Sequence, residues 1–103
     1  MILMILMTLN EIREKISFEV VKLKQLIAND IDYNKYYVIK STIVKLLKIE
    51  ELQILMDMKK TVIDFQEYNK QKDEINSILK QIEDYPCTTE GINQLIIILE
   101  KHI

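Results

Sequence analysis

Apolar residues recur along this chain at the spacing of an α-helix. The clearest run lies in the first third of the chain, at Leu9, Ile12, Ile16, Val20, Leu23 and Ile27. Intervals of three and four residues place all six side chains on one face, because an α-helix has about 3.6 residues per turn. The charged residues between them fall mostly on the other face. The pattern therefore predicts an amphipathic helix over 9–28.

Polar residues at both ends of this run mark helix boundaries. Thr8 and Glu11 have the spacing of a capping box, in which the hydroxyl accepts a hydrogen bond from the amide of Glu11 and the carboxylate reaches back to the amide of Thr8. The segment 29–32, Asn-Asp-Ile-Asp, supplies a break and a new cap. A second helix is therefore expected to start near Tyr33.

The middle of the chain predicts helix, but its boundaries stay open. A stripe of Tyr36, Ile39, Ile43 and Leu46/Leu47 defines the second helix, and a further stripe runs through Val44, Leu47, Met58, Val62 and Phe65. A third helix is expected over 50–66, either separate or continuous with the second. The alternative is a β-hairpin within 52–68 that turns at Lys59-Lys60, although neither lysine is a favoured turn residue.

The last third of the chain begins with a polar stretch. Residues 66–74 contain one apolar residue, Tyr68, and are interpreted as a turn or as a helix exposed to water. A fourth helix is expected from about 75 to 84, and Pro86 ends it. Thr88 caps a fifth helix. The continuous apolar run 95–99 also allows a buried strand.

These elements predict an all-α protein, a small antiparallel bundle of four or five helices. The whole chain, 1–103, is expected to form a single domain, with 1–7 as an apolar N-terminal extension. Hydrophobic residues make up 49% of the chain, enough for a core without disulfides or metal. A single glycine and a single proline leave 1–85 without the residues that most often interrupt helices.

Charge and cysteine content narrow the function classes. Sixteen acidic residues against fourteen basic ones give a net charge of −2, which argues against nucleic-acid binding, since phosphate neutralisation supplies most of that affinity. One cysteine cannot form an intrachain disulfide, so a cytoplasmic protein is expected. The apolar start of the chain is too short to cross a membrane and lacks the basic segment and cleavage site of a signal peptide.

The residues that usually carry chemistry are scarce. A closed zinc site needs four cysteine or histidine ligands, and the chain has only Cys87 and His102. Arg13 and His102 lie far apart in sequence, and Glu50-Glu51 fits a solvated charged face. Cys87 precedes a helix, a place that can lower a thiol pKa, but we expect a small packed or half-exposed loop cysteine, with a redox or catalytic role as the alternative. We therefore expect no catalytic residue, no metal, no cofactor and no enzymatic activity.

Surplus apolar and aromatic residues point instead to protein contacts. The N-terminal septet contributes Ile2, Leu3 and Leu6, which predict an oligomer or partner contact; packing on the chain's own core, or a true start at Met7, are the alternatives. At the start of the second helix, Tyr33, Tyr37 and Lys40 form the other candidate. The alternative placement has Tyr36 in the core and Tyr33 and Tyr37 at its rim.

The sequence thus predicts a protein-protein interaction module of bacterial or phage type. Such a protein acts as an inhibitor, immunity-type or adaptor protein by occupying a partner's surface, and a homodimer is expected. A dimeric helical transcriptional regulator is the alternative. It would contact nucleic acid through the lysines of the third and fourth helices, Lys59, Lys60, Lys70 and Lys72.

Overall fold

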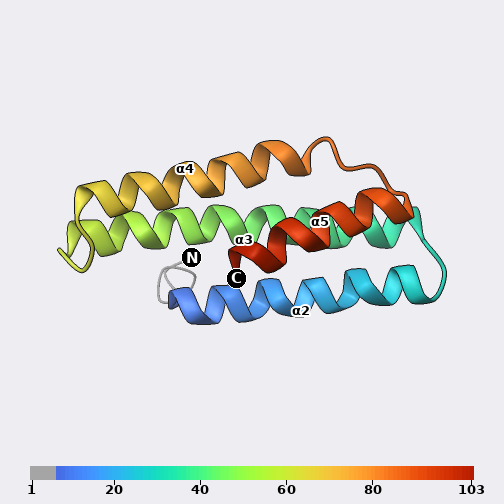
Figure 1. Ribbon diagram of the computed structural model, residues 1–103. Coiled ribbons are helices and arrows are strands. Elements are labelled where there is room, and N and C mark those ends of the chain that lie inside the picture. Colours follow the sequence, from blue (N-terminus) through green and yellow to red (C-terminus); the bar gives the residue numbers. More distant parts are fainter. Residues whose placement is uncertain (1–6) are drawn as a thin grey trace.

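Four antiparallel helices make up the described part of the chain, residues 7–103 of a computed structural model. They are α2 (Leu9–Ala28), α3 (Tyr33–Lys59), α4 (Phe65–Ile82) and α5 (Thr89–His102). Figure 1 shows them running alternately in opposite directions along one axis. No strand occurs within residues 7–103, so the all-α prediction is confirmed, and the hairpin in 52–68 and the strand over 95–99 are wrong.

The bundle is long because α3 is long. Its 27 residues span about 40 Å at 1.5 Å per residue, and the described chain measures 46 × 26 × 17 Å. Helix α2 packs against α3 and α5, α3 also packs against α4, and α4 and α5 meet only sparsely. Helix α5 is the shortest and ends partway along the bundle (Figure 1). Within residues 7–103, helices α3 and α5 each pack against α2 and α4 and not against the other, so they lie diagonally opposite each other.

All four helices bury an apolar stripe in one common core. The stripe predicted for 9–28 is confirmed in its centre, where Ile12, Ile16, Val20 and Leu23 are buried, with Leu9 and Ile27 partly buried at its ends. Further core residues come from α3, α4 and α5, among them Ile43, Leu47, Ile54, Ile75, Ile82, Ile92, Leu95 and Leu99. Burial of such side chains stabilises the fold by about 1.5–3 kcal/mol each.

Each helix starts at a residue whose side chain accepts a backbone hydrogen bond. Thr8, Asp32, Asp64 and Thr88 accept from the amides of Glu11, Lys35, Glu67 and Gly91. The Thr8 cap is confirmed with an N···O distance of 3.1 Å, and the Thr88 cap is confirmed with a distance of 3.0 Å. Such a cap contributes about 1 kcal/mol.

The predicted boundaries of the middle helices are wrong. Helix α3 continues through Glu50, so the predicted second and third helices are continuous, but α3 ends at Lys59 and α4 begins at Phe65, so the helix does not extend to 66. Residues 66–74 are helical, the second of the two interpretations given above. Val62 and Phe65, expected on an apolar stripe, are exposed near the α3–α4 turn.

Candidate functional site

Two tyrosines in the first turns of α3 form an exposed aromatic pair. The ring centroids of Tyr33 and Tyr37 lie 5.1 Å apart, and the ring planes are tilted by 50°. The two residues are 62% and 57% exposed, while Tyr36 is buried, as the rim placement predicted. A side-chain hydrogen bond with Tyr37 is the main cause that raises the pKa of the Tyr33 phenol. The pair presents two amphipathic rings to solvent.

Lys40, one turn further along α3, is held within the fold. Its ammonium donates to the carbonyl oxygen of Tyr85 at 3.1 Å and lies 5.5 Å from the centroid of the Tyr36 ring. The Tyr36 hydroxyl donates to the same carbonyl at 2.7 Å. Burial lowers the pKa of Lys40, and the carboxylates of Asp84 and Glu83 oppose that shift. Lys40 thus fastens the α4–α5 connection to α3, and the tyrosine pair is the accessible part of this site.

The single cysteine lies in the same region. Cys87 is a half-buried free thiol in the α4–α5 connection, and it lines an open depression together with Tyr33, Tyr37 and Lys40. His102 lies at the opposite end of α5, where its ring nitrogens face carboxylates. His102 therefore does not activate this thiol.

An ionic cluster centred on the buried Glu50 brings together one residue from each of the four helices. His102 of α5 places Nε2 2.8 Å from Oε1 of Glu50 in α3, and Nδ1 3.2 Å from Oε1 of Glu74 in α4. Arg13 of α2 donates from Nε to Oε2 of Glu50 at 3.4 Å. Glu50 is 1% exposed, and the His102 side chain is 5% exposed. Arg13 and Glu74 are partly exposed at its edge, so the cluster ties all four helices together from a buried centre.

This cluster corrects two expectations from the sequence. Glu50 was expected on a solvated face, but it is buried, and Arg13 and His102 meet at its carboxylate. The antiparallel packing explains this, because it brings the start of α2, the middle of α3 and the end of α5 to one level. A signal was present in the sequence: Glu50 continues the buried stripe of Leu47 and Ile54 at helical spacing.

The geometry of the cluster indicates a structural role. An ionised carboxylate only accepts hydrogen bonds, so a carboxylate at each ring nitrogen favours the doubly protonated ring. The hydrogen bond with Glu50 raises the pKa of His102, although burial opposes the shift. A doubly protonated ring has no free nitrogen with which to act as a general base. The carboxylates of Glu50 and Glu74 also lie at different ring nitrogens and so do not converge on one point.

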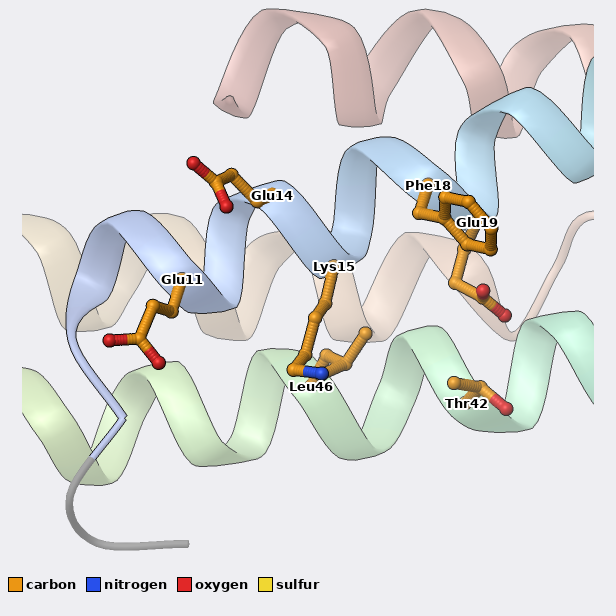
Figure 2. A pocket seen from close by; sticks show the side chains of 7 residues that line it. All are labelled: Glu11, Glu14, Lys15, Phe18, Glu19, Thr42 and Leu46. Atoms are coloured by element: carbon orange, nitrogen blue, oxygen red, sulfur yellow. The ribbon is translucent and has the colours of Figure 1, made fainter.

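A broad open depression lies between α2 and α3 (Figure 2). Its lining is mixed in charge and apolar character, with Glu11, Glu14, Lys15, Phe18, Glu19, Thr42 and Leu46. The Thr42 hydroxyl donates to the carbonyl oxygen of Val38 at 3.0 Å, and the carboxylate of Glu19 pairs with Lys22 at 2.9 Å. The Thr42 hydroxyl is the one hydroxyl in this lining, and it is already bonded to the backbone of α3. The depression therefore resembles an open surface groove more than a catalytic site.

Three of the predicted contact residues, Ile2, Leu3 and Leu6, lie outside the described residues. Met7 is half-buried and packs against the core. Within residues 7–103, no group of three or more His, Cys, Asp and Glu side chains is arranged to hold a metal ion. The same part of the chain contains no helix long and apolar enough to cross a membrane.

Comparison with protein-family models, with curated proteins and with solved structures finds no match to this chain. Among the sites described, the tyrosine pair of α3 presents two large exposed aromatic rings to solvent.

Proposed function

We propose that this protein is a small non-enzymatic interaction module that acts by occupying a surface of another protein, as an inhibitor, immunity-type or adaptor protein does. The observation that carries the proposal is the exposed pair of Tyr33 and Tyr37 on α3. Tyrosine is enriched among the residues that dominate binding energy at protein interfaces, because its ring buries a large area and its hydroxyl still donates a hydrogen bond.

The setting of the pair supports this role. Asp32 caps α3 directly before Tyr33, and Tyr36 and Lys40 hold the neighbouring connection through the carbonyl of Tyr85. Side chains presented by a fixed helix lose less conformational entropy on binding than side chains of a mobile loop. The pair is thus preorganised for contact.

Self-association and source belong to the same proposal. Exposed apolar side chains also occur on α2, at Phe18 and Val21, and they support a homodimer. We propose a cytoplasmic protein of a bacterium or phage, supported by the single cysteine and by the heavy use of Ile, Lys and Asn. Light scattering after size-exclusion chromatography tests the dimer, and a monomer at all concentrations contradicts it.

The partner is tested by a tagged pull-down from a bacterial lysate, with and without nuclease, read by mass spectrometry. We expect one protein to be retained after nuclease treatment. The variant Y33A/Y37A should lose it while helical content stays unchanged. The matched control is Phe65→Ala, which removes an exposed aromatic ring near the α3–α4 turn. Recovery that disappears with nuclease would instead favour a nucleic-acid-binding regulator.

A further inference from the structure

The solvent-exposed surface of α3 contains basic residues and no acidic residue. Ten of its positions are exposed, and all of α3 lies within the described residues. Four of the ten are lysines, four are large apolar residues, and two are small polar residues. In chain order they are Tyr33, Asn34, Lys35, Tyr37, Val38, Ser41, Lys45, Lys48, Leu52 and Lys59.

None of the three acidic residues of α3 is among its exposed positions. Glu50 is buried in the ionic cluster, and Glu51 and Asp57 are half-buried. Asp57 also accepts a hydrogen bond from the side-chain amide of Gln53 at 3.1 Å. The other helices differ, because each of them exposes two acidic residues: Glu11 and Glu14, Asp73 and Glu74, Glu90 and Glu100. The net charge of −2 therefore conceals a positive helix surface.

Three of the four exposed lysines and two of the four exposed apolar side chains fall on one ridge. Tyr37, Ser41, Lys45, Lys48, Leu52 and Lys59 follow one another at intervals of 4, 4, 3, 4 and 7 residues. These intervals keep them on one side of the helix along about 33 Å. The ion pairs found within residues 7–103 involve other cations, so the ridge lysines are not paired with carboxylates there.

We infer that this ridge of α3 is the binding surface, and that its partner is a protein with an acidic surface that also offers apolar contact. The inference rests on the proposed function and adds the chemistry of the partner. Lysines that form no ion pair with carboxylates of residues 7–103 create a positive potential that attracts a partner's carboxylates and speeds encounter. Tyr37 and Leu52, 57% and 60% exposed, lie on either side of Lys45 and Lys48 and supply the area that excludes water.

A protein partner fits this ridge better than a nucleic acid does. The ridge presents three lysines over its length and no arginine, whereas phosphate backbones are usually held by many cations. Leu52, the exposed leucine between Lys48 and Lys59, makes no favourable contact with a phosphate backbone. It can pack against an apolar patch of a protein that carries carboxylates around that patch.

The test couples the pull-down to zero-length cross-linking with a carbodiimide, which joins lysine amines to carboxylates in direct contact. The variant K45A/K48A removes two charges from the ridge. The matched control K70A/K80A removes two exposed lysines from α4, so that both variants change the net charge from −2 to −4, that is −2 − 2. Leu52→Ala and Ile97→Ala form a second matched pair, since both remove an exposed apolar side chain.

Three outcomes are distinguishable. Cross-links from Lys45 or Lys48 to Asp or Glu of one nuclease-resistant protein would support the inference. Its recovery should fall by about tenfold in K45A/K48A and stay within about twofold in K70A/K80A. A partner that is captured equally by both variants and cross-linked elsewhere would overturn the ridge but leave the proposed function standing. Absence of any nuclease-resistant protein partner would overturn both.

Discussion

The Nε2 atom of His102 lies 2.8 Å from Oε1 of Glu50, although the two residues are 52 positions apart. Helices α3 and α5 are diagonally placed, so this ion pair links elements that are not neighbours in the bundle. A carboxylate as buried as Glu50 is costly unless it is paired and hydrogen-bonded. The imidazolium of His102 and the guanidinium of Arg13 together supply that compensation.

The first prediction is that stability falls as the pH rises above the ordinary pKa of histidine, 6.5. The pKa of His102 is raised in the folded state, mainly by its hydrogen bond with Glu50. Above pH 6.5 the folded chain therefore holds a proton that the unfolded chain has released. The stabilisation is fully present below pH 6.5 and is lost as the pH passes through the folded-state pKa. Urea unfolding between pH 6 and pH 9 measures this.

The control for the pH prediction is His102→Gln, which keeps a hydrogen-bond donor near Glu50 but cannot titrate. We expect the free energy of unfolding of this variant to change less with pH than that of the parent chain over the same range. An identical pH dependence in the two proteins would show that another group is responsible.

The second prediction separates the cost of an unpaired charge from the value of the pair. His102→Leu leaves the buried carboxylate of Glu50 with only Arg13, at 3.4 Å, and should destabilise the fold by about 3 kcal/mol at pH 7. Adding Glu50→Leu should recover most of that loss, because two apolar side chains replace a buried pair. Denaturant unfolding of the two single variants and the double variant gives the coupling energy. Additive effects would contradict the prediction.

The helices were predictable from the sequence wherever an apolar stripe and a cap coincide. The helix over 9–28 is such a case, with Thr8 before it and the apolar residues Ile12, Ile16 and Val20 inside it. The cluster at Glu50 could not be predicted in this way. Sequence periodicity places a residue on one face of its helix, but it does not show which residues of other helices pack against that face. Arg13 and His102 reach Glu50 only through the antiparallel packing of three helices.

The missed boundary between α3 and α4 has a different cause. Helix α3 ends in a Schellman arrangement, in which the amide of Val62 donates to the carbonyl of Asp57 at 2.8 Å and the amide of Thr61 donates to that of Met58 at 3.0 Å. The residue at the left-handed position of this motif is usually glycine, but here it is Thr61, with φ of 60°. The glycine that usually marks such a helix end is therefore absent from the sequence. The first residues of α4 are mostly polar, so no apolar stripe marked where the next helix begins.

The third prediction concerns the hydroxyl of Tyr36. This group donates to the carbonyl of Tyr85 at 2.7 Å, and burial raises the pKa of the phenol to about 12, so the donor keeps its proton at neutral pH. Tyr36→Phe should lower the free energy of unfolding by about 1 kcal/mol. Lys40 still donates to the same carbonyl, so the loss should be larger in the double variant with Lys40→Met. A double variant as stable as the parent chain would show that these two hydrogen bonds to the Tyr85 carbonyl do not stabilise the α4–α5 connection.

The fourth prediction concerns the one glycine of the chain. A Cβ atom added to Gly91 would collide with the backbone carbonyl oxygen of Pro86 and would lie 2.8 Å from its Cδ. Alanine is the better helix former, so propensity alone predicts that Gly91→Ala stabilises α5. The collision is with backbone, which must shift, and we expect a destabilisation of about 1–3 kcal/mol instead. Thermal unfolding shows whether Gly91→Ala raises or lowers the stability of the fold. The control is Gln94→Ala, at an exposed position of the same helix.

The fifth prediction follows from the strained end of α3. Thr61 is β-branched and holds a left-handed backbone conformation, which costs a residue with a Cβ about 1–2 kcal/mol relative to glycine. Thr61→Gly should relieve that strain, but it also gives the unfolded chain more freedom, so the expected net gain is about 0.5–1 kcal/mol. Because Thr61 is exposed and its hydroxyl reaches only the carbonyl of Lys60, little packing is lost. The matched control is Thr61→Ala, which keeps a Cβ and should leave the urea midpoint nearly unchanged. Equal midpoints for the glycine and alanine variants would show that the left-handed backbone carries no strain.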